Sequence, residues 1–463
     1  MSAPPMNAFT DGPLGAIYLK TAMPIIFVMS VSGLLSVADA LFLGHYVGPE
    51  ALAAVTLIFP IFMLIVALST LVSSGMSSLL ARHLGGARFD QARGVFAGAH
   101  GLALAMSGVM IGLFLFSGPG LTLMLADGSA DLARMGQVYL TITVLFTPLM
   151  FVLSVNVDAL RNEGRVGFMA GMSLLVSLAN IGFNYVLIAW LEMGVAGSAY
   201  GTGAAQSLAL VIILMFRLRG NTRLRPDALS MRALFGFWRP ILALGAPQSL
   251  NFLGLALGSA VIIASLQWVG SPQYEQTVSA YGIITRVLTF TFLPLLGLAF
   301  AMQTITGNNF GAALWHRSDD SLRIALAVAL VYCLVVQIVL MAAPGLIARA
   351  FVSDPAVIAE VARILPVVSS VFFLMGPLMM IASYFQAIGS AKRAALLGLS
   401  KPYLFAIPLT LSLPLWFGEA GIWYAGPLAE LMLLATTILV LARAAQAEGL
   451  RWGIFQVQRE GRS

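Results

Sequence analysis

The sequence predicts an all-α integral membrane protein with twelve transmembrane helices in two pseudo-symmetric bundles of six. Three observations carry this prediction: a very apolar composition, twelve long apolar segments, and a repeat that relates the two halves of the chain. Of the 463 residues, 59% are hydrophobic and only 10% are charged, and the mean hydropathy is +0.93. Soluble domains carry about 25% charged residues. A chain this apolar is expected in a bilayer.

The apolar segments have the length of membrane-spanning helices. Runs of about 20 apolar residues cross a bilayer as helices, whereas the strands of a membrane barrel are about ten residues long and alternate in polarity. Gly, Pro and charged residues separate the runs. The expected spans of the first half are 21–44, 52–80, 94–116, 135–157, 167–190 and 195–216. Those of the second half are 241–268, 278–304, 322–343, 361–386, 395–417 and 421–442.

Lys and Arg residues set the expected orientation. Most of the 25 fall in alternate connections between the spans, and connections rich in positive charge stay in the cytoplasm. We therefore expect both termini in the cytoplasm and the protein in a bacterial inner (plasma) membrane. The net charge of +6 reflects these connections and does not indicate a nucleic-acid partner.

A basic connection at residues 217–240 divides the chain into two lobes, 1–216 and 241–463. The lobes match at a shift of about 224 residues, so that Pro24 falls near Pro247. Six spans in each lobe give both lobes the same orientation, which makes a parallel repeat about an axis along the membrane normal. Two such bundles are typical of transporters, which open a central cavity to either side in turn.

The first span carries one carboxylate in its interior, Asp39, and no other ionisable residue between Lys20 and His45. A carboxylate inside a membrane is costly and indicates a functional site. It can take up and release a proton, or hold a small cation. Pro24 and Gly33 favour a bent helix that lines a cavity, with Pro24 as its hinge. Alternatively, Asp39 lies near a helix end and its side chain reaches the interface.

Neutral polar residues in the same lobe can complete a site around Asp39. Asn180 and Asn184 lie one turn apart on the fifth span, and Thr202 and Gln206 repeat that spacing on the sixth. Amides and hydroxyls can hydrogen-bond a protonated aspartate or supply oxygens to a cation. We expect a cation- or proton-coupling site of Asp39, Asn180, Asn184 and Thr202, with Gln206 as a secondary candidate. Alternatively, these residues only join helices.

The spans of the second half contain three interior charges, Arg286, Lys401 and Glu430. A buried charge requires a partner, and either cation could pair with Glu430. We interpret Glu430 as a structural residue that joins the eighth, eleventh and twelfth spans, with a second ion site as the alternative. The 22 Met and 28 Phe residues fit an adaptable apolar cavity.

Several function classes are disfavoured. Cys333 is the only cysteine, and the four histidines are scattered, so we expect no disulfide and no metal site. The spans hold no second aspartate, Ser/His set or metal cluster with which an intramembrane enzyme could work. We therefore expect no enzyme activity and no cofactor.

Five stretches together resemble the multidrug and toxic compound extrusion (MATE) family, and the resemblance covers nearly the whole chain. They are Asp39 in the first span, Leu84-Gly85-Gly86, DALRNEG at 158–164, NIGFN at 180–184 and GVAGSAYGT at 194–202. The resemblance implies twelve helices in two lobes that form a V. It also implies efflux of organic cations and drugs against an inward H⁺ or Na⁺ gradient.

The resemblance is to the prokaryotic branch that has a cation site in its N-terminal lobe. That branch places an aspartate on helix 1, an asparagine and then an aspartate on helix 5, and a threonine on helix 6. Asp39, Asn180 and Thr202 match this pattern, whereas Asn184 stands where the branch has aspartate. A single carboxylate suits a proton better than Na⁺. The branch with carboxylates on helices 7 and 10 is matched poorly, because neither expected span has one in its interior.

We therefore expect a secondary antiporter that exports amphipathic, mostly cationic drugs and toxic organic compounds by alternating access. The coupling ion would be H⁺, with Na⁺ as the alternative. Proton binding by Asp39 would change its bonds to Asn180 and Thr202 and bend helix 1 near Pro24. A monomer is expected, since two lobes already enclose a pathway. The alternative function is a flippase for lipid-linked sugars or phospholipid-like substrates, with Arg286 and Lys401 binding phosphate.

Overall fold

The computed structural model describes residues 7–125, 129–220, 222–225, 231–270 and 273–455. These residues are almost entirely helical, and the part of the chain so described contains no strand beyond a single bridge between Arg451 and Phe455. The expected all-α fold class is confirmed. The backbone of Asp39 is helical, but its side chain lies outside the described residues.

The chain forms two compact units. Unit 1 comprises Met1–Ala8 and Met23–Ser249, and unit 2 comprises Phe9–Ala22 and Leu250–Ser463. Two helices are therefore each divided between the units. The helix α1 (Leu14–Tyr46) changes unit at Met23, and the helix α10 (Trp238–Val269) changes unit after Ser249.

A proline accompanies each change of unit. Pro24 lies inside α1 one residue after its change, and Pro247 lies inside α10 two residues before its change. Proline removes one backbone hydrogen bond and crowds the preceding turn, so it weakens a helix locally. These two positions are 223 residues apart in the sequence, as the repeat requires.

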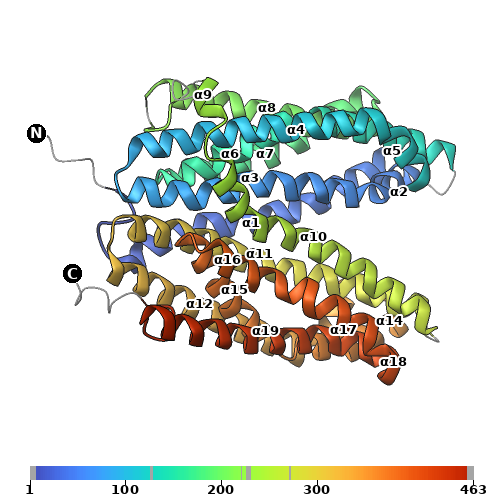
Figure 1. Cartoon of the computed structure of the whole chain (residues 1–463). Coiled ribbons are helices and arrows are strands. Elements are labelled where there is room, and N and C mark those ends of the chain that lie inside the picture. Colours follow the sequence, from blue (N-terminus) through green and yellow to red (C-terminus); the bar gives the residue numbers. More distant parts are fainter. Residues whose placement is uncertain (1–6, 126–128, 221, 226–230, 271–272, 456–463) are drawn as a thin grey trace, which may run out of the picture. The chain divides into compact units, whose positions relative to one another are not determined.

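Unit 1 is a bundle in which α7 packs against α8, and α3 packs against α4 and α6 (Figure 1). Its helices are α1 from Met23, α2 (Pro49–Leu57), α3 (Phe59–Gly85), α4 (Phe89–Leu125), α5 (Ala130–Leu145), α6 (Thr147–Asn162), α7 (Val166–Asn184), η1 (Tyr185–Trp190), α8 (Gly194–Leu218), α9 (Met231–Leu234) and α10 to Ser249.

Unit 2 repeats this packing with α11 against α12 and α15, and with η3 and α17 against α19 (Figure 1). Its helices are the first residues of α1, α10 from Leu250, α11 (Tyr274–Gly311), α12 (Trp315–Ala342), α13 (Pro344–Arg349), α14 (Pro355–Val368), α15 (Phe372–Ala387), α16 (Ala391–Leu399), η3 (Ser400–Ala406), α17 (Ile407–Ser412), α18 (Pro414–Phe417) and α19 (Glu419–Glu448).

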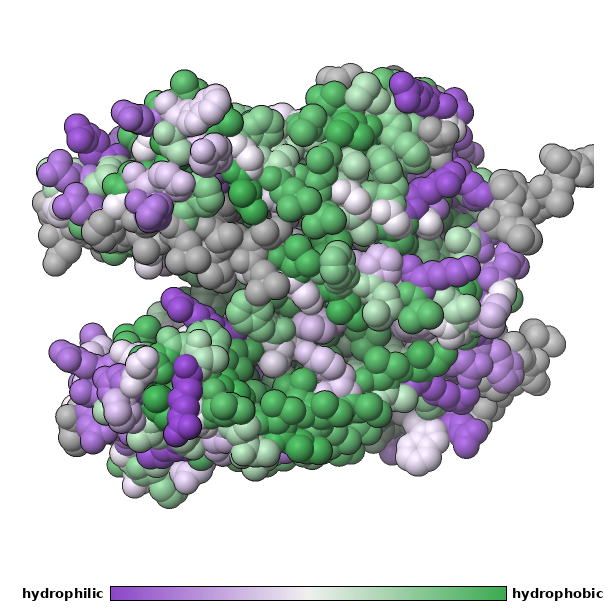
Figure 2. Space-filling view, turned by 180° about the vertical axis from the view of Figure 1, so that it is seen from behind, coloured by the Kyte–Doolittle hydropathy of each residue, from purple (hydrophilic) through white to green (hydrophobic). Residues whose placement is uncertain are grey.

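The surface of the helices suits a bilayer. Among the described residues, 10 helices are long and apolar enough to span, or up to 12 if each of two bent pairs is one span. Large apolar side chains are exposed along them, such as Phe116 on α4 and Val331 on α12. Figure 2 shows hydrophobic surface over the middle of the helices and hydrophilic surface toward their ends. Such a distribution matches an apolar membrane core between two polar interfaces.

Both units contain the same irregularities at the expected spacing. In unit 1, α5 and α6 are bent by 48° at a break at Phe146, and in unit 2, α14 and α15 are bent by 50° at a break at residues 369–371. Gly164 and Gly389, 225 residues apart, have φ of 80° and 86° directly after these spans. A residue with a side chain is strained at such φ values. The repeat in the sequence therefore has a counterpart in the backbone.

Some boundaries differ from the expected ones. The segment 217–240 contains the last turn of α8, the short helix α9 and the start of α10. The tenth span begins at Pro355, six residues before the expected start at residue 361. It begins there because Asp354 caps the helix: its Oδ1 accepts from the amide of Ala356, 2.9 Å away.

Candidate functional site

Polar side chains meet between α7 and α8 in unit 1. The amide nitrogen of Asn180 donates to Thr202 Oγ1 at 2.9 Å, and that of Asn184 donates to Asn180 Oδ1 at 3.3 Å. Thr202 Oγ1 in turn donates to the carbonyl oxygen of Ser198 at 3.1 Å. Asn180 and Asn184 are both buried. Three of the four residues expected in the coupling site are thus joined in one chain of hydrogen bonds.

A close approach of the two helices holds Asn184 in place. A Cβ atom added at Gly201 of α8 would lie 2.1 Å from Asn184 Oδ1 and 3.2 Å from its backbone nitrogen. Only glycine leaves room for the amide there, because real Cβ atoms do not approach oxygen so closely. The glycine at 201 therefore decides where the Asn184 side chain lies.

The helix α1 reaches this site beside α7. Ser32 Oγ of α1 lies 3.4 Å from Ser177 Oγ of α7, and Ser177 donates to the carbonyl oxygen of Ser173 at 3.2 Å. Asp39 follows Ser32 by seven residues, and Asn184 follows Ser177 by seven. Seven residues make about two helical turns, or about 10.5 Å of rise. The Asp39 side chain itself lies outside the description of the structure.

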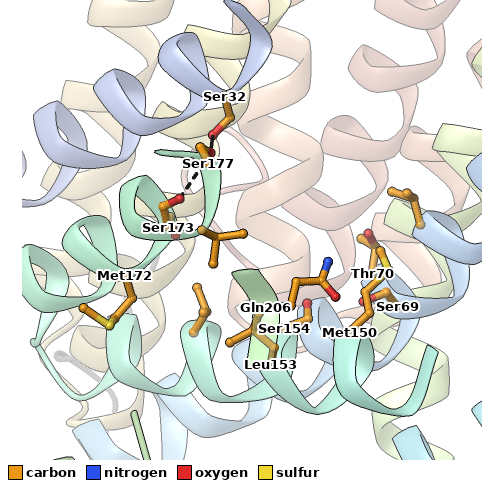
Figure 3. A pocket seen from close by; sticks show the side chains of 13 residues that line it. Ser32, Ser69, Thr70, Met150, Leu153, Ser154, Met172, Ser173, Ser177 and Gln206 are labelled. Atoms are coloured by element: carbon orange, nitrogen blue, oxygen red, sulfur yellow. Dashed lines mark hydrogen bonds between the residues drawn. The ribbon is translucent and has the colours of Figure 1, made fainter. Parts of the chain in front are cut away.

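A pocket of about 330 Å³ opens in unit 1, one turn along α7 and α8 from the Asn180–Thr202 bond. Binding pockets for small molecules usually measure about 300–1,000 Å³. Figure 3 shows Ser32, Ser173 and Ser177 on one side of this pocket, with Gln206 and Ser154 on the other. Gln206 was expected in the coupling site, and it lines the pocket.

The lining of the pocket differs from the cavity that composition indicated. Met150 and Met172 contribute together with four Val and Leu residues, but no phenylalanine does, and six residues with hydroxyl groups share the lining. Serines at 32, 69, 154, 173 and 177 escaped the sequence interpretation, because single serines are common where membrane helices pack together. The spacing of Ser173 and Ser177, four residues apart and in register with Asn180 and Asn184, is the signal that could have located them.

Of the three interior charges expected in the second half, two form an ion pair and one cation stands apart. Lys401 of η3 pairs with Glu430 of α19, as one of the two expected pairings requires, and the Glu430 side chain is buried. Arg286 of α11 is exposed and forms no ion pair or hydrogen bond with another described residue. Glu430 therefore joins two of the three expected spans, those that contain η3 and α19. The third span, which contains Arg286, is not joined through it.

A buried carboxylate in the tenth span was missed. Glu360 of α14 is 8% exposed and bonds bidentately with Arg363, which also contacts Glu419 of α19. Thr277 of α11 donates to Glu360 at 3.2 Å. Glu360 lies in the second turn of α14 and outside the expected span 361–386, because the helix starts earlier than its apolar run. Glu360 is fully engaged by an arginine and a hydroxyl, which indicates a joint between three helices.

The environment expected for an arginine at the end of α8 was also wrong. Arg217 is completely buried, although it was expected in the basic connection 217–240. It donates to Glu163 Oε2 at 2.9 Å, to Asn156 Oδ1 at 2.9 Å and to the Leu224 carbonyl oxygen at 2.7 Å. Glu163 Oε1 accepts from the backbone amides of Arg223 and Leu224. Burial raises the pKa of the Glu163 carboxyl, and the guanidinium and the two amides oppose that rise.

Comparison with known proteins decides the family. The family model of MatE matches residues 24–186 and 247–412, which together make up well over half of the chain. The chain belongs to the MATE family. The two matched segments begin 223 residues apart, and the second lies in unit 2 from Leu250 onward, so the family match follows the internal repeat.

Individual relatives are similar over nearly the full length. The chain is 24% identical to the FAD transporter of Shewanella oneidensis over 92% of this chain and 94% of that one. It is 21% identical to the multidrug export protein MepA of Staphylococcus haemolyticus over 91% and 92%. A solved outward-facing structure of a MATE multidrug resistance transporter matches with a TM-score of 0.85, at 21% identity, over 95% and 97%.

Membership in the MATE family makes the chain a multi-pass membrane transporter. MATE proteins are ion-coupled transporters and not enzymes, so the intramembrane enzyme is set aside. The expected twelve-helix MATE fold is confirmed by the matching structures.

Proposed function

We propose that this MATE transporter is a secondary antiporter that exports amphipathic, mostly cationic organic compounds in exchange for H⁺. The observation that carries the proposal is the buried chain from Asn184 through Asn180 to Thr202, next to a pocket of about 330 Å³. A polar chain of this kind inside a membrane span responds strongly to a nearby change of charge. Relatives named for multidrug export and for FAD transport support small organic cargo.

The position of Asp39 along α1 supports its place in this site. Helices α1 and α7 both follow an even number of spans, so they run in the same direction. From the contact between Ser32 and Ser177, two further turns on each helix lead to Asp39 and Asn184. We infer that Asp39 belongs to one coupling site with the Asn180 and Asn184 amides, and that its protonation state sets their hydrogen bonds.

Pro24 is the proposed hinge for the resulting motion. It lies in α1 directly after the residue at which this helix changes from unit 2 to unit 1. A proline inside a helix removes one hydrogen bond and allows a bend. Protonation of Asp39 would bend α1 there and shift the equilibrium between the two access states.

Proton coupling is favoured over Na⁺ coupling by the orientation of Asn184. Its amide nitrogen donates to Asn180, and its Oδ1 is packed against Gly201. A cation such as Na⁺ is held by several converging oxygens, and a second carboxylate would add negative charge to its site. An amide in this orientation supplies neither a second charge nor an oxygen directed into the site.

The test uses purified protein in proteoliposomes loaded with ethidium, with either a pH gradient or a Na⁺ gradient at clamped membrane potential. We expect the pH gradient to drive efflux and Na⁺ to have little effect. Asn184→Asp restores a second carboxylate and should make efflux respond to Na⁺. Efflux by the unmodified protein that saturates with Na⁺ at constant pH would contradict proton coupling, and no ethidium movement under either gradient would contradict the antiporter.

Gly201→Ala should slow proton-driven efflux by roughly fivefold, since the new methyl group displaces Asn184 and breaks a hydrogen bond worth about 1 kcal/mol. Initial efflux rates at equal reconstituted protein measure the effect. Gly171→Ala is the matched control, because its added Cβ meets no atom within 4 Å. Equal rates for the two variants would show that the position of Asn184 does not matter.

The flippase alternative is not favoured. It required Arg286 and Lys401 to bind phosphate together, whereas Lys401 is paired with Glu430. For the protein in the cell, we propose an inner-membrane monomer with both termini in the cytoplasm, which agrees with the arginine-rich connections.

A further inference from the structure

One face of α11 is polar along the membrane-spanning part of unit 2. Its exposed residues include Ser279, Gly282, Arg286 and Thr289, which recur every three or four positions and so form one stripe. No large hydrophobic side chain of α11 is exposed anywhere between Tyr274 and Gly311. We call these four residues the α11 stripe.

The neighbouring helix α12 shows what a lipid-facing surface of this protein looks like. Its exposed residues include Val328, Val331, Val335 and Ile338, at the same helical spacing and all apolar. Helices in contact with acyl chains present such side chains. The α11 stripe has the opposite character, which is unfavourable in contact with acyl chains.

Arg286 lies deep in this stripe. It follows Glu275, the preceding charged residue of α11, by eleven residues, or about 16 Å along the helix. An arginine side chain is too short to return that distance to the interface. The opposite face of the same turn, formed by Ile283, Ile284 and Val287, is buried in the apolar core of unit 2. A cation at this depth requires an anionic partner or water.

No carboxylate of the described residues supplies that partner. Glu430 is engaged by Lys401, and Glu360 is engaged by Arg363. Arg286 itself takes part in no hydrogen bond, ion pair or ring contact with the part of the chain that is described. The guanidinium group is well suited to bind carboxylate or phosphate with two parallel hydrogen bonds.

We propose that Arg286 binds an anionic group, carboxylate or phosphate, of the transported compound. The α11 stripe then lines the aqueous pathway, and Ser279 and Thr289 flank the bound group with hydroxyls. The inference rests on the proposed function and extends it, since the cargo would include compounds that carry an acid in addition to their apolar and cationic parts.

The first test compares two dyes that differ in whether one carboxylate is free or esterified. Rhodamine 19 carries a free carboxylate, and rhodamine 6G is its ethyl ester. In proteoliposomes, Arg286→Gln should lower the ratio of acid to ester transport at least tenfold, which equals about 1.4 kcal/mol. Arg286→Lys should keep most of the ratio, because the charge remains. Arg349→Gln, at an exposed arginine of α13, is the matched control and should not change the ratio.

The outcomes separate this inference from the antiporter itself. If the unmodified protein exports the ester but not the acid, or if Arg286→Gln leaves the ratio unchanged, anion recognition by Arg286 is wrong and the antiporter stands. If neither dye is exported, the antiporter fails, and binding of each dye to purified protein decides the role of Arg286 alone. Riboflavin and flavin mononucleotide, compared in the same way, distinguish phosphate from carboxylate as the bound group.

A second measurement tests whether the α11 stripe faces water. Cys333, the only cysteine, is buried, so an introduced cysteine can be followed by itself. Ser279→Cys should react with a charged, membrane-impermeant thiol reagent, whereas Val331→Cys on α12 should not. Equal protection of both positions would place the stripe in lipid or in protein and overturn the inference.

Discussion

Asp39→Asn is expected to abolish efflux driven by a pH gradient while leaving the amount of folded protein in the membrane unchanged. Asparagine has nearly the same shape as aspartic acid but cannot exchange a proton, so the coupling step is lost while the helix packing remains. The change can be measured as ethidium efflux from proteoliposomes with an imposed pH gradient. We expect the rate to fall to that of protein-free vesicles.

Exchange of internal for external dye without any gradient distinguishes loss of coupling from loss of transport. Asp39→Asn should retain this exchange, because the pocket on α7 and α8 is unaltered. Glu50→Gln is the matched control, since it removes an exposed carboxylate at the start of α2. The mechanism through Asp39 is refuted if the variant pumps the dye against its gradient as well as the unmodified protein does.

Arg217→Met is expected to destabilise the protein strongly. The substitution leaves the Glu163 carboxylate buried, with only backbone amides as partners. Removing one member of a buried ion pair costs about 3–5 kcal/mol. For a unit of this size, that corresponds to a fall in apparent Tm of roughly 6–20 °C. Thermal unfolding of the detergent-purified protein measures it.

Two further variants give this prediction its control. Arg134→Met removes an exposed arginine from α5 and should change Tm little. The double variant Arg217→Met with Glu163→Gln should recover part of the lost stability, because it no longer buries an unpaired charge. If the double variant is as unstable as Arg217→Met alone, the loss arises from packing around Arg217 and not from its ion pair.

Local periodicity was sufficient to predict several features. The spacing of Asn180 and Asn184 placed both amides on one face of a helix, and the bond between them follows from it. The pairing of Lys401 with Glu430 followed from the rule that a buried charge requires a partner. These predictions succeeded because they depend only on helix geometry and on the cost of burying charge.

Other features depend on contacts between residues far apart in the chain. Arg217 was expected in the basic connection 217–240, but the chain folds back so that residues 222–224 cover it. Glu360 looked like part of an exterior connection, but α14 begins before its apolar run. Hydropathy detects neither a helix cap nor a connection that folds back on a helix. It therefore predicts the wrong burial for charged residues that lie just beyond an apolar segment.

The sequence by itself determined that the chain is a membrane protein of helices arranged as an internal repeat, because composition, segment length and spacing are properties of the chain alone. Only the tertiary structure decided that α1 and α10 each change unit beside a proline, that hydroxyls line the pocket in unit 1, and that Arg286 stands apart from Glu430. The physical reason is that helix periodicity fixes which residues share a face, whereas the neighbour of that face is set by packing between distant segments.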